Sequence, residues 1–397
     1  MAAWLLISST NAQVINFWRG PNRDGKYPDK NLLKAWPEAG PTLVWSYNTL
    51  GKGYTSPSIV DGKLYITGLE GDKGFLYIFS EAGALLKKVE YGKDVIARYP
   101  GPRSSPLIDG KLCYIVSGFG QLVCMNTETD QIVWSKELFK DFDGANITFS
   151  FTENMLIDGD KLYVFPGGKK YNVVALNKKS GELIWSGEGK GDVSAYCSPI
   201  LITHNGKRML INMMSTSVVA INPADGTLMW SYPFSNSNKI HPNSPIYRDG
   251  FLYIFCGYSK GGEQLQINPE GTMVTSVWKN QTVDPQMGGA ILKGNMIYAS
   301  GDRNRKWFCV DWTTGAIKHQ TTALEKGTLI EADDMLYLFT EKKQLALVQP
   351  QADSIKIVSQ MMIVPGSDEA WAHLVIKNGI LYVRRGNALL AFDVRKK

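Results

Sequence analysis

A unit of roughly 40 to 49 residues repeats along the chain and restricts the choice of fold more than any other feature. Its clearest copy runs from Ser198 to Trp230. This copy contains two strand-like segments joined at Asn205-Gly206, a third segment, and a fourth that follows Asp225-Gly226 and ends on tryptophan. Asn-Gly and Asp-Gly supply the positive φ that a tight hairpin needs, so each unit predicts four antiparallel strands. Equivalent turns recur at Gly62, Gly110, Gly159, Gly206, Gly250, Gly294, Asp334 and Gly379.

Repeats of this length and strand content are typical of propeller blades, so we expect an all-β, eight-bladed β-propeller of four-stranded antiparallel blades. The eighth unit ends after a strand over Leu389–Asp393, whereas Leu43–Ser46 is a strand with no hairpin partner. Joining these two strands would close the ring without an open edge. We therefore expect one propeller domain over residues 43–397, after an extended segment over 13–42. Seven blades is the alternative if the irregular seventh unit is an insertion, and no long amphipathic period predicts a substantial helix.

Residues 1–12 resemble the remnant of a secretory signal peptide. A short apolar core and small residues precede Gln13, with Thr10-x-Ala12 placed like a cleavage site. No positively charged region precedes them, which a trimmed start would explain. We expect a periplasmic or secreted protein, and the alternative is a cytoplasmic protein with an apolar N-terminus. We predict no transmembrane segment, because this segment is too short and no later stretch is long enough, and no cysteine is placed for lipidation.

Charge and cysteine content exclude some classes of function. The formal net charge of +6 comes from 43 basic and 37 acidic residues that are dispersed along the chain, so we predict no nucleic-acid partner. The four histidines have no short metal-ligand spacing, and we predict no metal site. The cysteines are far apart and form no C-x-x-C, so we expect free, buried thiols at Cys113, Cys124, Cys197, Cys256 and Cys309.

The units also end in a regular pattern, whose best copies are Ala175–Trp185 and Ala220–Trp230. Cys124–Trp134 follows it more loosely, and Cys309–His319 follows it until His319 takes the place of tryptophan. The pattern resembles the tryptophan-docking motif, A-x-D-x-x-T-G-x-x-x-W, of the quinoprotein-type propellers. The resemblance covers residues 43–394. It implies that each glycine takes a left-handed turn and each tryptophan packs between blades, which concerns fold and not function.

Two branches of that superfamily differ in what they would imply. The pyrroloquinoline-quinone (PQQ) dehydrogenases are usually longer, and they hold the quinone with a pair of adjacent cysteines and a calcium ion. This chain has no such pair and no recognisable calcium ligands, so we predict neither cofactor. The outer-membrane-protein assembly lipoprotein is an eight-bladed scaffold of similar length, without catalysis, but its lipidated cysteine is missing here. The chain looks most like exported quinoprotein-like propellers of bacteria.

The opening W-R-G-P-N-R-D-G, Trp18 to Gly25, is shared with that exported branch. We interpret it as a Gly-Pro turn with Arg-Asp pairing that pins the N-terminal tail across the propeller. A functional role is the alternative. A second short motif, G-x-S-x-G at Gly257–Gly261, lies in a predicted hairpin and not at a strand-to-helix elbow, so we interpret it as a loop.

The residues just before each innermost strand are the candidate ligand-binding set, because these positions meet at one mouth of the central channel. Aromatic faces suit sugar rings and arginine suits a carboxylate, so they predict a small polar ligand or a glycan. The alternative is that each side chain fills the channel or hydrogen-bonds the next blade, and a register error of one residue would reverse its direction. The candidates are Tyr54, Arg103, Glu153, Tyr196, His241, Asn243, Gln286, Trp371 and His373.

Three functions are compatible with these residues. The first is a non-catalytic exported binding or scaffold module that holds a small polar ligand, a glycan or a protein partner at the mouth. The second is an enzyme acting on a carbohydrate or an alcohol, with His241 or His373 as proton-transfer group and Arg103 or Tyr196 orienting the substrate. The third is a quinone-dependent dehydrogenase. We expect the first, and the sequence leaves the oligomeric state open.

Overall fold

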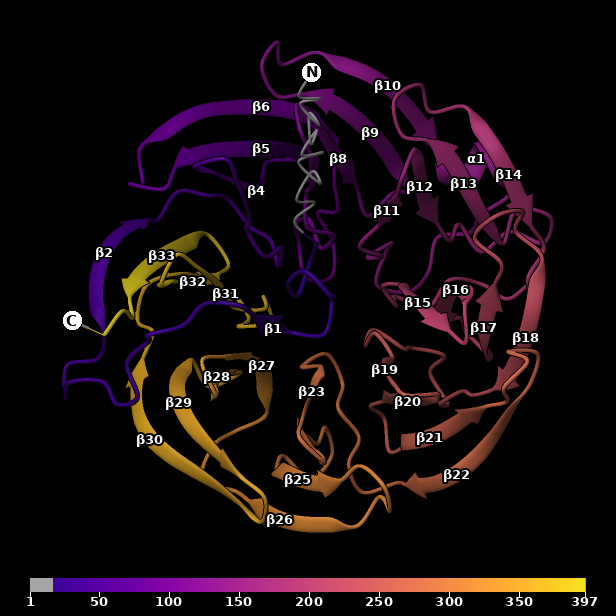
Figure 1. The fold of residues 1–397 in the computed structure, drawn as a ribbon. Helices are drawn as coiled ribbons and strands as arrows, with labels where there is room; N and C mark the ends of the chain where they lie inside the picture. The colour runs from indigo at the N-terminus through magenta and orange to yellow at the C-terminus, as the bar shows by residue number, and fades with distance from the viewer. Residues whose placement is uncertain (1–16, 397) are drawn as a thin grey trace, which may run out of the picture.

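The computed structural model describes residues 17–396, which form eight β-sheets arranged in a ring (Figure 1). The predicted eight-bladed propeller is confirmed, and the seven-blade alternative is wrong. The only helix in the described residues is the single turn α1 (Leu138–Asp141). Residues 1–12, the predicted signal remnant, lie outside the described part of the chain.

Blades 1 to 7 are each built from four strands that are consecutive in sequence, with the first strand nearest the channel. Blade 1 consists of β3 (Ser58–Val60), β4 (Lys63–Glu70), β5 (Lys73–Ser80) and β6 (Leu85–Lys93), and blade 2 of β7 (Leu107–Asp109), β8 (Leu112–Val116), β9 (Gln121–Asn126) and β10 (Ile132–Glu137). Blade 3 consists of β11 (Leu156–Asp158), β12 (Lys161–Val164), β13 (Val173–Asn177) and β14 (Leu183–Gly187), and blade 4 of β15 (Ile200–His204), β16 (Lys207–Met213), β17 (Ser217–Ile221) and β18 (Leu228–Pro233). Blades 5 to 7 consist of β19 (Ile246–Arg248), β20 (Phe251–Cys256), β21 (Gly261–Ile267) and β22 (Val274–Asn280); β23 (Ala290–Lys293), β24 (Met296–Ser300), β25 (Trp307–Asp311) and β26 (Ile317–Thr321); and β27 (Gly327–Ala332), β28 (Met335–Thr340), β29 (Gln344–Gln351) and β30 (Ser354–Met362).

Blade 8 closes the ring with strands from both ends of the chain, as predicted. Its inner strands are β31 (Val375–Lys377), β32 (Ile380–Arg385) and β33 (Ala388–Asp393), and its outer strand is β2 (Thr42–Tyr47), antiparallel to β33. The register pairs Leu43 with Phe392 and Tyr47 with Leu389. Because one sheet contains both ends of the propeller, its hydrogen bonds hold the first and last blades together.

The N-terminal segment crosses the channel before it reaches blade 8, and Figure 1 shows this indigo stretch running through the centre of the ring. Its strand β1 (Lys26–Tyr27) pairs in parallel with β27, with Lys26 opposite Glu331 and Tyr27 opposite Ala332. Two residues are too short for a hydrophobic alternation to predict, and the sequence did not indicate this strand. Blade 7 therefore has a fifth strand on its channel side.

The docking turns have the geometry that the tryptophan-docking motif implies. Gly181 has a φ of +72°, and the Asn177 side-chain oxygen accepts hydrogen bonds from two backbone N–H groups of the turn, the first at 2.9 Å. Trp134 of blade 2 packs on Gly181 of blade 3, where a Cβ atom would lie 2.6 Å from the indole. The Trp134 Nε1–H donates to the Lys178 carbonyl at 3.1 Å. Each such turn therefore fixes the outer edge of one blade to the next.

Apolar side chains fill the layers between blades. Between blades 3 and 4, for example, the buried cluster includes Tyr163, Val173, Leu210 and Val219. All five cysteines are free and buried in these layers, as predicted. The described residues contain no helix that is long and apolar enough to cross a membrane.

Candidate functional site

A cavity of about 220 Å³ opens at one mouth of the channel, where the loops between blades meet. Of the nine candidate residues, the structure brings six to its wall: Tyr54, Arg103, Tyr196, Gln286, Trp371 and His373. Ten further residues line the cavity, and the sequence did not single them out as lining residues. They are Trp18, Tyr99, Phe149, Thr152, Asn154, Ser198, Ile240, Pro242, Tyr258 and Met287. Most of the wall is aromatic or apolar, which is typical of a site for a small organic ligand.

The N-terminal segment forms the floor of this cavity. The indole of Trp18 meets the ring of His373 edge to face, with centroids 5.1 Å apart. Below it, Arg19 donates to the Ala290 carbonyl of blade 6 at 3.1 Å, and Arg23 donates to the Met155 carbonyl of blade 3 at 2.7 Å. Two buried guanidinium groups thus attach the segment to opposite sides of the ring.

This arrangement agrees with the predicted pinning of the tail, but the predicted Arg-Asp pairing is wrong. Arg19 reaches only the backbone carbonyl of Asp24, at 3.5 Å, and the Asp24 carboxylate accepts instead from the Lys26 N–H at 3.1 Å. Burial raises the pKa of Asp24 and lowers the pKa of both Arg19 and Arg23 to about 10. The arginines therefore pin the segment by bonding to main-chain carbonyls across the channel.

His373 lies under the cavity with both ring nitrogens occupied. Its Nδ1 is 3.1 Å from the Arg19 guanidinium, which can only donate, so Nδ1 accepts and Nε2–H donates to the Met287 carbonyl at 3.0 Å. Burial and the positive charge of Arg19 hold the pKa of His373 well below its usual value. The imidazole is consequently neutral and fixed in one tautomer.

Glu153 and His241 lie behind the wall and do not line the cavity. The Glu153 carboxyl is fully buried and accepts from the Phe165 N–H, and burial raises its pKa well above the usual value. His241 is also fully buried, and its Nδ1–H donates to the Met214 carbonyl at 2.7 Å. Burial lowers the pKa of His241 to about 4, and its Nε2 has no hydrogen-bond partner among the described residues.

The Asn243 side chain also makes hydrogen bonds within the fold and does not line the cavity. Its side-chain amide donates to the Pro285 carbonyl at 2.8 Å and accepts from the Gly289 N–H at 3.0 Å, which ties blade 5 to blade 6. The neighbours of these buried candidates, Asn154 and Pro242, line the cavity instead. This is the one-residue register error that the sequence could not resolve, because the loops before the innermost strands have no strict alternation.

An aromatic arc forms one side of the cavity. Its centre is Trp371, whose ring lies 4.7 Å from that of Tyr99, edge on, and 5.2 Å from that of Tyr54. The Trp371 Nε1–H donates to Glu341 at 3.2 Å, and the Tyr54 hydroxyl donates to Glu369 at 3.2 Å. Hydrogen bonds therefore hold the polar tips of both side chains, and both residues line the cavity.

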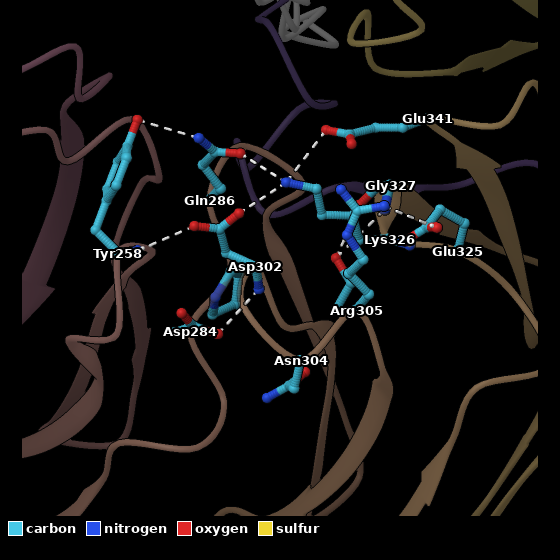
Figure 2. Close-up of polar contacts among 12 residues, drawn as sticks. Tyr258, Asp284, Gln286, Asp302, Asn304, Arg305, Glu325, Lys326, Gly327 and Glu341 are labelled. Atoms are coloured by element: carbon cyan, nitrogen blue, oxygen red, sulfur yellow. Dashed lines mark hydrogen bonds and ion pairs between the residues drawn. The ribbon is translucent and has the colours of Figure 1, made fainter.

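A second part of the wall is polar and rests on Lys326, whose contacts are drawn in Figure 2. The Lys326 ammonium group contacts Gln286 Oε1 at 3.0 Å, Asp302 at 2.7 Å and Glu341 at 3.5 Å. Gln286 in turn donates through Nε2 to the Tyr258 hydroxyl at 3.0 Å. Lys326 thus orders side chains from blades 5, 6 and 7.

Arg103 carries the charge at the cavity wall. Its guanidinium donates to the backbone carbonyls of Gly101, Arg98 and Tyr99, at 3.1, 2.9 and 2.8 Å. Burial lowers the pKa of Arg103, although the group stays cationic at neutral pH. No carboxylate forms a salt bridge with it in the part of the chain that the structure describes.

Two of the missed residues had a signal in the sequence. Tyr258 is the variable residue of the G-x-S-x-G loop, which forms the β20–β21 turn, and Trp18 begins the N-terminal motif. Both stretches had been interpreted as structural, and both contribute one residue to the cavity. Tyr99 and Phe149 lie further from the innermost strands, in loops without any recognisable pattern.

Comparison with known proteins places the fold in a family. The family model described as outer membrane protein assembly factor BamB matches residues 72–321. The chain belongs to this family. A curated relative, the quinoprotein alcohol dehydrogenase PedH of Pseudomonas putida, is 25% identical over 199 residues, which are 48% of this chain and 31% of that protein. The chain therefore matches only about a third of the length of that relative.

Solved structures agree on the fold. BamB from Moraxella catarrhalis superposes with a TM-score of 0.64 at 13% identity, over 89% of this chain and 99% of that one. The quinohemoprotein alcohol dehydrogenase ADHIIG from Pseudomonas putida HK5 superposes with a TM-score of 0.66 at 12% identity, over 96% of this chain and 80% of that one. At such identities the likeness concerns architecture alone, which an assembly factor and alcohol dehydrogenases share.

Two features of the described residues differ from the calcium and quinone site that the resemblance to the dehydrogenases implies. Among residues 17–396, no three His, Cys, Asp or Glu side chains converge in a way that could hold a metal ion. The five cysteines are isolated and buried, and the channel below the cavity contains Trp18 and Arg19. We derive no chemistry through a quinone.

Proposed function

We propose that this protein is a non-catalytic binding module that holds a small, ring-bearing polar ligand, such as a sugar, at the mouth of its channel. The observation that carries the proposal is the aromatic arc of Tyr54, Tyr99 and Trp371 above a floor formed by Trp18. Stacking on aromatic faces with a few fixed polar groups is how protein pockets orient small polar rings. A cavity of about 220 Å³ suits a compact ligand.

The polar chemistry of the cavity supports binding over catalysis. General acid–base catalysis needs a titratable group within hydrogen-bond reach of the reacting atom. His373 has both nitrogens engaged and a depressed pKa, and His241 lies behind the wall. An enzyme acting on a carbohydrate or alcohol would have to break the Arg19 or Met287 contact to use His373.

The family supports a binding role as well, since its model is described as an assembly factor. A protein partner is the second candidate ligand. Ile96 and Val364 are 57% and 80% exposed on the two loops that also supply Tyr99 and Trp371 to the cavity. A protein that inserts a side chain into the cavity would cover these two residues.

The proposal is tested with a panel of monosaccharides that includes glucose, galactose, N-acetylglucosamine and glucuronate. We expect saturation-transfer NMR to detect at least one of them bound to the purified protein. Trp371→Ala should weaken that binding about fivefold, because stacking on an aromatic ring contributes about 1 kcal/mol.

Trp185→Phe, in a docking turn on the outer edge, is the matched control and should bind like the wild type. The proposal is wrong if no sugar binds, or if Trp371→Ala binds as well as the control. Turnover of any panel sugar, or reduction of an artificial electron acceptor by an alcohol in the presence of PQQ and calcium, would favour the enzyme instead.

We further propose that the protein works outside the cytoplasm. The signal-like composition of residues 1–12 and the family's description as an outer membrane protein assembly factor support this location. Fractionation of cells that express the full gene should recover the protein in the periplasm or the medium, and recovery with the cytoplasmic fraction would contradict the proposal.

A further inference from the structure

The two side chains of the cavity wall that can carry a charge near neutral pH are both basic. Of the lining residues, only Arg103 and His373 can carry a charge near neutral pH, and none is an aspartate or glutamate. His373 is held neutral by burial and by its contact with Arg19. Arg103 therefore supplies one positive charge to a largely apolar wall, and within residues 17–396 its guanidinium donates to backbone carbonyls. Such a charge gains stability from an anion placed beside it.

The orientation of Gln286 can be deduced from Lys326. An ammonium group has hydrogens and no acceptor, so the atom of Gln286 that lies 3.0 Å from it must be the carbonyl oxygen. The NH₂ end of Gln286 then faces the Tyr258 hydroxyl, which accepts one of its hydrogens. The second amide hydrogen of Gln286 and the hydroxyl hydrogen of Tyr258 remain as donors at the cavity wall (Figure 2).

The carboxylates near the cavity are already occupied. Glu369 accepts from Tyr54, and Glu341 accepts from Trp371. Asp302 is paired with Lys326, at 2.7 Å, and that ion pair is mostly buried. Asp94, which lies near Arg103, accepts from the Tyr91 hydroxyl at 2.6 Å and from two backbone N–H groups. These groups lie behind the wall and are neutralised or hydrogen-bonded, so they leave the donors of the wall free to meet a ligand.

We propose that the cavity selects an anionic sugar, whose ring stacks on Trp371 and whose carboxylate or phosphate is held by donors from Arg103, Gln286 and Tyr258. This inference rests on the proposed function and adds the charge of the ligand. Lys326 is a positioning residue in this scheme. Lys326 does not line the cavity, but it fixes the amide of Gln286 and, through Glu341, the indole of Trp371.

The test compares glucose with glucuronate and glucose 6-phosphate, which share one ring and differ in the group on its sixth carbon. We expect isothermal titration to show that one of the two anions binds at least tenfold more tightly than glucose, as is typical of a charged hydrogen bond. Arg103→Gln should remove most of that preference. Arg103→Lys, which keeps the charge, should retain part of the preference.

Lys326→Met tests the positioning role, because it frees the Gln286 amide to rotate without altering Arg103. It should weaken binding of the preferred anion severalfold, and the side-chain amide signals of Gln286 should shift in NMR spectra of the unliganded protein. Circular dichroism identifies any variant that fails to fold, and Arg103→Lys then carries the comparison.

The outcomes separate the two proposals. Equal or tighter binding of glucose overturns the anionic selectivity and leaves the sugar-binding function standing. An anion preference that survives in Arg103→Gln overturns the assignment to Arg103. Failure of all three sugars to bind, together with the rest of the panel, counts against the binding function itself.

Discussion

The outer docking turns and the channel mouth are built from the same repeated unit, but they differ in how regular they are. At the turns, Gly181 and Gly226 have nearly equal φ values, +72° and +83°, and each receives a tryptophan from the preceding blade. At the mouth, the blades contribute a tyrosine, an arginine, a glutamine and a tryptophan at comparable places. Regularity in a repeat protein identifies what each unit needs for folding, and departure from it marks the positions that are free to serve binding.

The largest expected effect concerns the turns. Gly226→Ala would place a Cβ atom 2.5 Å from the Trp185 ring at a φ of +83°, so we expect a loss of about 3 kcal/mol from crowding and backbone strain. Gly206→Ala is the matched control, because its φ is +79° but its Cβ would meet nothing within 4 Å, and it should cost about 1 kcal/mol. Equilibrium urea unfolding measures both. Equal losses would show that tryptophan docking contributes nothing.

A second expected effect comes from the buried His241 behind the mouth. Its pKa is about 4 in the folded protein against an ordinary value of 6.5, so below that value the unfolded chain binds the proton more readily. Folding stability should therefore fall as the pH is lowered, by about 2 kcal/mol between about pH 7 and about pH 5 from this group alone. His373, whose pKa is also depressed, acts in the same direction.

The measurement is the unfolding free energy of the wild type and of His241→Phe across this pH range. The variant should show a shallower slope, because it has lost a group that takes up a proton when the chain unfolds. An unchanged slope would contradict the assignment of a depressed pKa to His241.

The third expected effect distinguishes a structural residue from a binding residue at the mouth. Asn243→Ala leaves the Gly289 N–H without its acceptor, and we expect a loss of about 1 to 3 kcal/mol in stability. The affinity for sugars should stay within about twofold of the wild type, because Asn243 does not line the cavity. Gln286→Ala should instead weaken the binding of sugars and leave the stability close to that of the wild type. Weakened binding in Asn243→Ala at full stability would return Asn243 to the ligand-binding set.

The sequence predicted the architecture well because the fold depends on features that repeat. The Asp-Gly and Asn-Gly turns, the docking tryptophans and the spare strand around Leu43 together indicated eight blades and the way the ring closes. Free buried cysteines followed from their spacing. Strand β1 was missed because two residues of parallel pairing leave no pattern in a sequence.

The mouth was predicted only in part, for two physical reasons. The loops before the innermost strands are irregular, so a one-residue shift exchanged Glu153 for Asn154 and His241 for Pro242. Contacts across the ring depend on how distant segments meet, as in the bonds from Arg19 and Arg23 of the N-terminal segment to blades 6 and 3. No local pattern encodes such contacts.

The central claim is that residues at the channel mouth bind the ligand, whereas residues of the docking turns stabilise the fold. Titration of glucuronate into two variants tests this claim most directly. At a temperature where both are folded, Trp371→Ala should lose about fivefold in affinity while keeping most of its stability. Gly226→Ala should keep the wild-type affinity although it is less stable. Wild-type affinity in Trp371→Ala, or equal losses of affinity in both variants, would contradict the claim.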